Sequence, residues 1–268
     1  MNEPPGARDS SGLVVRRLES HLTGIARART VRRAVAGTRF CAVLLDDGSA
    51  GVANIAGSAC HQSAPPGVDW LPPPGTPAAI ALAGLDRRDR SAIGLATANA
   101  LANRSSRKGG RWDEASFGGD VLAALELTRR DRVGMVGHFA PLVDRIRRTV
   151  EQLFIFERAP DPDSGLLPET RAFELLPECS VAMVTATTVT NGTCDAILAA
   201  ASNCREVVLL GPSTPLVPEV FAGPPRLATL LAGIVVVNPE ELLHTVAQGG
   251  GTRDFGGSVA KVNVRVSA

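Results

Sequence analysis

The sequence contains no tyrosine, and aromatic residues make up only 4% of its 268 positions. The absence of tyrosine excludes a reaction that uses a tyrosine hydroxyl as its proton donor. Cysteine is scarce as well, and no pair shows the C-x-x-C spacing of a structural zinc site. The odd number argues against a disulfide framework, so we expect most of these residues to be buried as small apolar side chains. The five are Cys41, Cys60, Cys179, Cys194 and Cys204.

A strong charge of either sign is also missing. The net charge of +1 gives no electrostatic reason to expect nucleic acid as a partner. No apolar run approaches the roughly 20 residues that span a bilayer, and residues 1–11 are polar without the apolar centre of a signal peptide. We therefore expect a disordered tail over residues 1–11 and a cytoplasmic protein with no membrane partner. Protease, hydrolase and nucleotide-triphosphatase motifs are absent, namely H-E-x-x-H, G-x-S-x-G and the Walker loop.

With 44% apolar residues the chain can build a proper core, and its two halves differ in pattern. Residues 12–120 predict a smaller α+β domain. It starts with a helix from Gly12 to Ala28 and continues with two strands around the hairpin turn Asp46-Asp47-Gly48. The strands are expected over Thr38–Leu45 and Ala50–Ile55, and later helices over Ala78–Leu85 and Ser91–Ala102.

Residues 121–268 predict an α/β domain with a Rossmann-like, doubly wound parallel sheet. Near-continuous apolar runs are typical of parallel strands that helices cover on both faces. The expected strands are Val133–Val136, Leu153–Phe156, Val181–Thr185, Val207–Leu210 and Ile234–Val237. The clearest crossover helix has Asn238 as its cap, Pro239 in first position and Gly249 to Gly251 after its end. The boundary between the domains is expected within residues 115–130.

The first turn of this second domain indicates a nucleoside site. A strand with Gly134 ends in Gly137-His138-Phe139, and Glu157 follows at the end of the next strand. Rossmann domains use such a turn to admit ligand to the backbone, and such an acid to hold ribose hydroxyls. Only two of the three glycines of G-x-G-x-x-G are present, which disfavours a pyrophosphate cradle. Two alternatives remain, an adenosine-containing ligand without a diphosphate or a strand packed tightly against its neighbour.

The segment after the third strand is rich in threonine and is expected to be a loop that contacts ligand. Its candidate contacts are Thr187, Thr188, Asn191, Gly192 and Thr193, where Asn191-Gly192 readily adopts left-handed backbone geometry. Helix capping by Thr193 is the alternative, although it explains only part of the segment.

Two further candidates lie at strand ends. Ser213 follows the fourth strand, where Thr214 before Pro215 is typical of a helix N-cap. His138 is the histidine placed at a predicted strand end, which makes it the first candidate for acid–base catalysis. A lone histidine is more often a hydrogen-bonded structural group, and that alternative stays open.

Five ordered motifs resemble an uncharacterised bacterial and archaeal family labelled "putative heavy-metal chelation". They are residues 134–142, 156–160, 187–193, 208–215 and 249–252, and the resemblance covers roughly residues 130 to 255. It implies a domain like the N-terminal domain of enolase, then a Rossmann-like domain, with the active site between them. His138, Glu157, Cys194 and Asp195 could supply metal ligands, but no pair has a recognised metal spacing.

Two functions follow as hypotheses. The first is an enzyme acting on a small molecule, with an adenosine-containing cofactor, S-adenosylmethionine being the best candidate, held in the cleft between the domains. In it Glu157 holds the ribose, Phe139 and the glycines line the ligand, and Ser213 is a further contact. The rival is a non-catalytic protein that binds a heavy metal or a metal chelate. A transferase or lyase activity and a homodimeric assembly are open alternatives.

Overall fold

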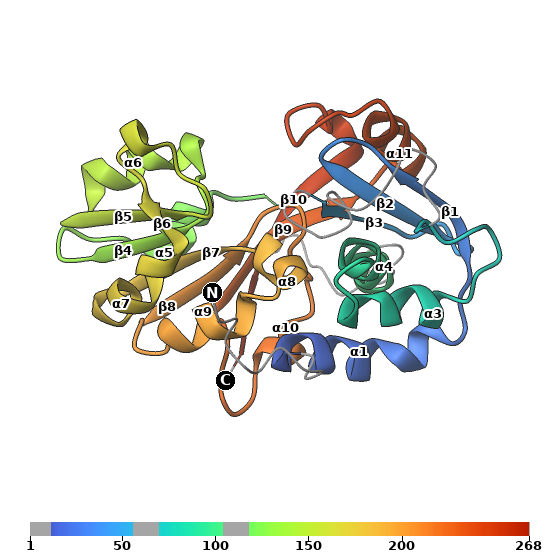
Figure 1. Ribbon diagram of the computed structural model, residues 1–268, viewed down its shortest axis with the longest axis horizontal. Helices are drawn as coiled ribbons and strands as arrows, with labels where there is room; N and C mark the ends of the chain where they lie inside the picture. Colours follow the sequence, from blue (N-terminus) through green and yellow to red (C-terminus); the bar gives the residue numbers. More distant parts are fainter. Residues whose placement is uncertain (1–11, 56–69, 104–117, 268) are drawn as a thin grey trace, which may run out of the picture.

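The computed structural model describes residues 12–55, 70–103 and 118–267. The predicted tail, residues 1–11, and Cys60 lie outside these ranges. The described part contains a three-stranded antiparallel sheet and a seven-stranded, mostly parallel sheet, each covered by helices (Figure 1). This confirms the predicted fold class. No helix among the described residues is long and apolar enough to cross a membrane.

The small sheet is buried on both faces. Its strands are β1 (Val31–Ala36), β2 (Phe40–Leu45) and β3 (Ala50–Asn54). Since successive side chains of a strand point to opposite faces, Cys41, Val43 and Leu45 pack against one core while Phe40 and Leu44 pack against another. The helices below the sheet are α1 (Leu13–Ala26), α3 (Ala78–Leu82), the 3-10 turn η1 (Ala83–Asp86) and α4 (Ser91–Asn103). The hairpin and these helices were predicted, whereas β1 was not.

The large sheet has the strand order β10-β9-β8-β7-β4-β5-β6. All neighbouring strands are parallel except the last pair, β9 and β10. Five of the seven strands were predicted, and the two missed ones, β6 and β10, form the edges. The strands are β4 (Arg132–Val136), β5 (Gln152–Glu157), β6 (Leu167–Pro168), β7 (Val181–Thr185), β8 (Glu206–Leu210), β9 (Leu230–Val236) and β10 (Val259–Arg265).

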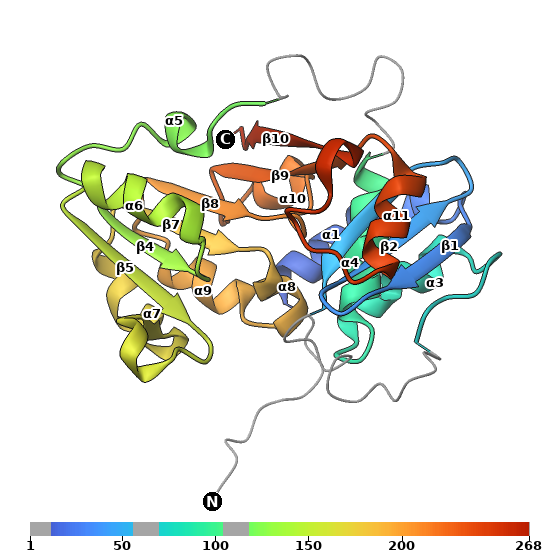
Figure 2. The same cartoon turned by 90° about the horizontal axis from the view of Figure 1, so that it is seen from above.

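Helices cover both faces of the large sheet. On one face lie α5 (Val121–Leu125) and α6 (Ala140–Thr149). On the other lie α7 (Ala172–Leu175), α8 (Thr187–Asn191), α9 (Cys194–Ala200) and α10 (Pro218–Phe221). Figure 2 shows α6 on one side of the strands and α7 and α9 on the other. The side chains on this second face form a core that is continuous with that of α1 and α4. Short 3-10 turns complete the chain, namely η4 (Pro162–Ser164), η5 (Glu169–Arg171), η6 (Leu176–Glu178) and η7 (Gly256–Ser258).

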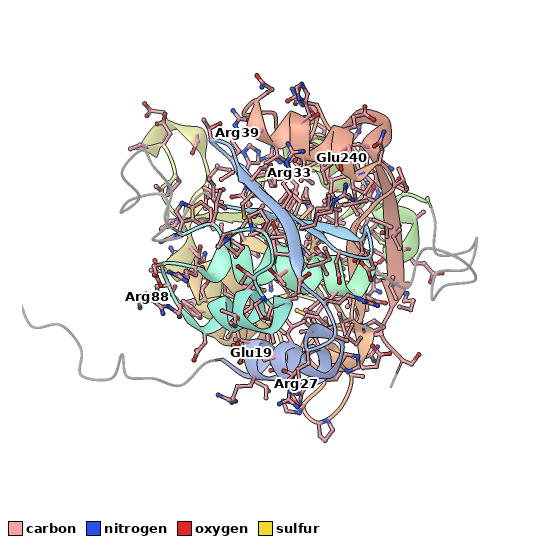
Figure 3. The ribbon with its side chains drawn as sticks, turned by 90° about the vertical axis from the view of Figure 1, so that its right-hand side faces the viewer. Glu19, Arg27, Arg33, Arg39, Arg88 and Glu240 are labelled. Atoms are coloured by element: carbon pink, nitrogen blue, oxygen red, sulfur yellow. The ribbon has the colours of Figure 1, made fainter. Side chains whose placement is uncertain are left out.

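Helix α11 (Pro239–Ala247) begins as predicted, because the Asn238 side chain accepts a hydrogen bond from the Glu241 backbone N–H. It is not a crossover between parallel strands, however, because it connects β9 to the antiparallel β10. Instead it packs on the small sheet, where Leu243 joins Phe40 in one apolar cluster. At the surface Glu240 of α11 pairs with Arg33 of β1 at 3.2 Å (Figure 3). The second half of the chain thus completes the core of the first.

Two polar contacts join the halves from the other side. The Asp195 carboxylate on α9 accepts a hydrogen bond at 3.1 Å from the Val14 backbone N–H and so caps α1. The Asn99 amide on α4 donates to the carbonyls of Val52, at 2.9 Å, and Ser213, at 3.2 Å. Side-chain to backbone bonds therefore join α1 to α9, and α4 to both β3 and the loop after β8.

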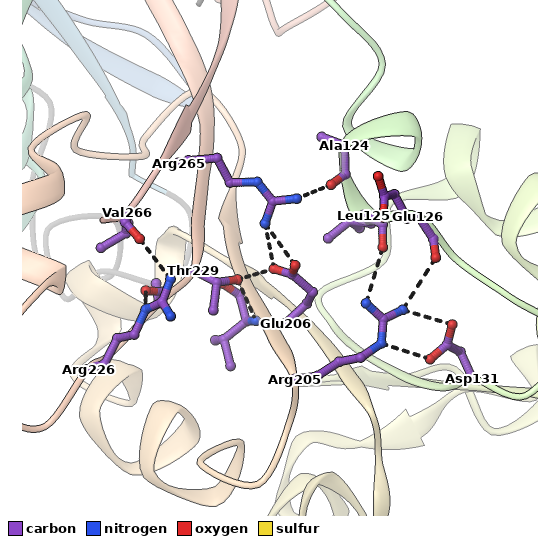
Figure 4. Close-up of polar contacts among 12 residues, drawn as sticks. Ala124, Leu125, Glu126, Asp131, Arg205, Glu206, Arg226, Thr229, Arg265 and Val266 are labelled. Atoms are coloured by element: carbon purple, nitrogen blue, oxygen red, sulfur yellow. Dashed lines mark hydrogen bonds and ion pairs between the residues drawn. The ribbon is translucent and has the colours of Figure 1, made fainter. Parts of the chain in front are cut away.

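A polar network fixes the start of the second half (Figure 4). The buried Asp131 carboxylate accepts hydrogen bonds from Arg205 at 2.9 Å, Ser180 at 2.7 Å and the Thr128 backbone N–H at 2.7 Å. Burial by itself would raise the pKa of Asp131, but these donors outweigh it and hold the pKa well below its ordinary value. Because the donors favour the charged form, the network stabilises the folded chain at neutral pH.

Candidate functional site

The order of the large sheet places its topological switch point between β4 and β7. The chain passes from β4 to β5 and β6 on one side, and then to β7 and β8 on the other. Ligands of open parallel sheets bind beyond the carboxyl ends of the strands at such a point. A cavity of about 170 Å³ lies there. It is lined by Gly137, His138, Phe139, Glu157, Arg158, Glu169, Thr185, Thr187 and Asn191.

Gly137 ends β4 in a conformation that favours glycine, with φ of 89°. A Cβ at this position would lie 2.9 Å from the Thr185 side chain, which is too close. The Gly137 N–H donates to the Phe156 carbonyl at 2.8 Å and thereby extends the pairing of β4 with β5. Glycine is thus required for the turn and for the close approach of β7.

Gly134 has a different role from the one expected. A Cβ there would lie 2.4 Å from the Leu176 side chain and 3.3 Å from the Cys179 sulfur. Both residues lie on the helical layer that covers the sheet, so Gly134 makes room for packing rather than for ligand. Gly134 is also not among the residues that line the cavity.

Glu157 stands at the end of β5, held by two backbone amides. One carboxylate oxygen accepts from the His138 N–H at 3.1 Å, and the other from the Arg158 N–H at 3.0 Å. These bonds hold the half-buried carboxylate between the ends of β4 and β5. The carboxylate lies at the end of β5, where the sequence predicts an acid that binds ribose.

His138 and Phe139 lie between β4 and α6. The His138 residue is exposed and lines the cavity. The Phe139 ring is partly buried and lies near both turn glycines, 3.7 Å from a Cβ built at Gly137 and 4.0 Å from one built at Gly211. Phe139 therefore forms an apolar wall of the cavity, while His138 remains accessible for proton transfer or ligand contact.

The threonine-rich segment is a helix where a loop was expected. Thr187 and Asn191 begin and end α8, and residues four apart share one face of a helix. Both line the cavity. The Asn191 side-chain oxygen accepts from the N–H and hydroxyl of Thr193, at 3.0 and 2.8 Å. Its amide nitrogen makes no hydrogen bond to the described residues and can donate to a ligand.

The remaining candidates of this segment lie away from the cavity. Thr188 is fully buried, and its hydroxyl donates to the Thr185 carbonyl at 2.7 Å. Gly192 ends α8 with a left-handed φ of 80°, as the Asn-Gly pair predicts. Thr193 precedes α9 but makes no side-chain cap bond. The three residues shape the α8–α9 corner, and only Thr187 and Asn191 reach the cavity.

Ser213 also lies outside the cavity. It is buried in the seam between the halves, where its hydroxyl oxygen accepts from the Asn54 backbone N–H at 2.8 Å. The prediction that Thr214 caps a helix is wrong. Its hydroxyl donates to the Ala232 carbonyl, and the next helix begins only at Pro218. Ser213 and Thr214 thus connect this loop to β3 and to β9, which explains why both side chains are small and polar.

Three lining residues were not among the sequence candidates. Thr185 ends β7, Arg158 follows Glu157, and Glu169 begins η5 after the two-residue strand β6. No signal in the sequence predicts β6, so Glu169 could not be placed. Among the described residues, none before residue 137 lines this cavity. The Ser91 hydroxyl on α4 instead donates to the Thr190 carbonyl at 2.9 Å, so the first half supports α8 from behind.

The donors present do not form a metal centre. Within residues 12–55, 70–103 and 118–267, no three His, Cys, Asp or Glu side chains are grouped to hold an ion. Burial raises the pKa of Cys179 to about 11 and of Cys194 to about 12, and it raises that of Cys204 to about 12. Metals bind the thiolate, so these protonated thiols are poor ligands. Asp195, a ligand candidate from the sequence, caps α1.

The fold and the cavity define an α/β protein with a Rossmann-like sheet and a polar site at its switch point. The chain belongs to the family DUF364, described as "putative heavy-metal chelation", whose model matches residues 120–265. A second model with the same description, DUF4213, matches residues 19–102. The resemblance inferred from the five motifs is confirmed.

Similar proteins support the fold. A DUF364 protein of unknown function from Pyrococcus horikoshii has a TM-score of 0.79 at 22% identity, covering 94% of this chain and 100% of that one. One from Desulfitobacterium hafniense has a TM-score of 0.74 at 23% identity, covering 94% and 98%. An uncharacterised Methanocaldococcus jannaschii protein is 32% identical over 109 residues, which are 39% of this chain and 42% of that protein. The alignment thus spans less than half of that relative.

Proposed function

We propose that this chain binds a small molecule containing a nucleoside, with Glu157 accepting hydrogen bonds from the ribose hydroxyls. The observation that carries this proposal is the carboxylate at the end of β5, held in the switch-point cavity by the amides of His138 and Arg158. An acid at this position of a Rossmann-type sheet is suited to a ribose diol. The family match by itself names neither a cofactor nor a reaction.

Glu157 has capacity for such a ligand. An ionised carboxylate offers about four acceptor positions, of which the two backbone amides use one on each oxygen. Two positions therefore remain for two ribose hydroxyls. Because the amides fix the carboxylate before a ligand arrives, little side-chain freedom is lost on binding.

The cavity limits the size of what it encloses. Its volume of about 170 Å³ is below the roughly 300 to 1,000 Å³ of sites that enclose a drug-sized ligand. It suits the nucleoside portion of a ligand whose remainder lies outside. S-adenosylmethionine is our best candidate for the whole molecule. In this proposal Asn191 and Thr187 contact its polar end, Phe139 packs against it, and His138 is the acid–base group.

Calorimetric titration with adenosine, S-adenosylhomocysteine and S-adenosylmethionine tests the proposal. Replacing Glu157 with alanine removes hydrogen bonds to a charged group, each worth about 1.5 to 3 kcal/mol, so affinity should fall roughly 10- to 150-fold. Glu151→Ala is the matched control, because Glu151 is exposed beside the other end of β5. Equal affinity of the wild-type and Glu157→Ala proteins would exclude Glu157, and no titration signal from any nucleoside would contradict the function.

Metal or metal-chelate binding is the second candidate, and the family description is what favours it. The described residues offer no three-ligand centre. A metal chelate that brings most of its own ligands would need only one or two protein donors, such as His138 or Glu169 at the cavity. Elemental analysis of protein purified without added metal tests this function, and a stoichiometric transition metal retained through dialysis would support it.

A further inference from the structure

A second carboxylate lies beside the proposed ribose site. In the pairing of β5 with β6, Glu157 is opposite Pro168, and Glu169 follows directly at the start of η5. Neighbouring strands of a sheet are about 4.8 Å apart, so these two acids leave the sheet at the same edge. Both line the same cavity, and both are partly buried. Arg158 also lines it and offsets one of the two charges.

The turn after β4 corresponds to the turn that holds phosphates in nucleotide-binding sheets, but in this chain its amides already have partners. Such turns bind phosphate through backbone N–H groups that have no partner in the protein. Here the Gly137 N–H donates to the Phe156 carbonyl at 2.8 Å, and the His138 N–H donates to Glu157 at 3.1 Å. Both amides are therefore already used by the sheet and by the acid.

The following helix offers few donors as well. Pro141 lies in the first turn of α6 and has no N–H. The Leu142 N–H donates to the Phe139 carbonyl at 2.8 Å. Two positions in the first turn of α6 therefore offer no N–H to an anion, one because it is proline and one because its N–H is already bonded.

From these observations we propose that the site selects phosphate-free nucleosides and rejects nucleotides, with Glu169 as the residue that determines this specificity. The proposal rests on the nucleoside function above and names its ligand class. A phosphate monoester carries a charge of about −1.5 to −2 at pH 7, and it is repelled by the net negative charge that two carboxylates and a single guanidinium leave in the cavity. A neutral or cationic substituent at the same place is accepted.

Competitive titration with adenosine and AMP at equal ionic strength tests the selection. Wild-type protein should bind AMP at least about tenfold more weakly than adenosine, and the ratio should shrink as salt screens the carboxylates. Glu169→Gln keeps the shape and removes the charge. It should bring the affinity for AMP several-fold closer to the affinity for adenosine. Glu174→Gln is the control, because this exposed glutamate of α7 lies outside the cavity.

The outcomes separate the two proposals. If neither compound binds, the nucleoside function fails and the selection fails with it. If adenosine binds but AMP binds equally well, or if Glu169→Gln leaves the ratio unchanged, the nucleoside function stands and the role of Glu169 is overturned. A circular dichroism spectrum and melting temperature equal to those of the wild type would show that the variant is folded.

Discussion

Asp131 is the buried charge on which the start of the large sheet depends. Its side chain is 6% exposed, and the Asp131→Ala substitution would remove an acceptor of Arg205, of Ser180 and of the Thr128 amide. We expect a loss of about 2 to 4 kcal/mol in the free energy of unfolding, measured by urea denaturation. Asp144→Ala, at an exposed position on α6, should change it by less than about 0.5 kcal/mol.

The same carboxylate predicts a pH dependence with a definite sign. Because the pKa of Asp131 is lowered in the folded chain, its contribution is fully present above the unfolded value of about 3.9 and is lost as the pH falls below it. The wild-type free energy of unfolding should therefore decrease from about pH 4 to pH 2, and Asp131→Asn should flatten this part of the profile. Parallel profiles for the two proteins would contradict the assignment.

Substitutions of Gly134 and Gly137 should have different effects, because Gly134 packs against the helical layer and Gly137 forms the turn at the cavity. Gly134→Ala places a Cβ 2.4 Å from Leu176 and should cost about 1 to 3 kcal/mol in stability with nucleoside affinity unchanged. Gly137→Ala combines a left-handed φ with a close contact to Thr185, so it should lower both stability and affinity. Thermal denaturation and titration measure the two effects. Weaker binding by a well-folded Gly134→Ala protein would restore its role as a ligand residue.

The position of a single residue could be predicted from the sequence only where the residues next to it form a clear element. Gly137, His138 and Glu157 follow long apolar strands, so their position at the sheet edge was predictable. Glu169 was not, because it follows a strand of only two residues whose pairing depends on tertiary contacts. The burial of Thr188 could not be predicted, because a threonine-rich segment does not show which hydroxyls turn inward.

Helix α1 depends on an acid from another part of the chain. Its own first residues provide no side-chain cap, and Asp195 of α9 accepts the hydrogen bond of the Val14 N–H instead. Asp195→Ala should destabilise the protein by about 1 kcal/mol, and Asp195→Asn by less, because asparagine keeps the acceptor and loses only the charge near the helix dipole. Chemical denaturation of the three proteins checks this order. If the asparagine variant were as unstable as the alanine variant, charge rather than capping would dominate.

At the scale of elements, the central strands of the large sheet were predictable and its two edges were not, whereas the small sheet had one predicted edge strand, β3, and one missed edge strand, β1. Each of the five predicted strands is a continuous apolar run, as burial on both faces requires. β1 and β10 carry charged residues among their apolar ones, as in Val-Arg-Arg-Ala-Val-Ala, and edge strands tolerate such residues because one side remains open. The start of α11 was predictable from its local capping residues, whereas its partner sheet, nearly 200 positions earlier, had no local signal.

For the whole molecule, the shared cores predict a single unfolding transition. One apolar cluster combines Leu18 of α1 with Ile197 of α9, and another combines Phe40 of β2 with Leu243 of α11. Neither half can unfold without exposing apolar surface of the other. Scanning calorimetry should therefore show one peak whose calorimetric and van't Hoff enthalpies agree. Two resolved peaks would show that the halves are independent folding units.

The position of α11 also sets an order of events during synthesis of the chain. The strands of the small sheet are complete once Asn54 has been added to the chain. The helix that covers Phe40 and Leu44 is complete only when Ala247 has been added. At about 5 to 20 residues per second, the interval is roughly 10 to 40 seconds. During this time a nascent antiparallel sheet has one apolar face open to water and to other chains. Binding by a ribosome-associated chaperone in that interval would protect it until the last tenth of the protein is made.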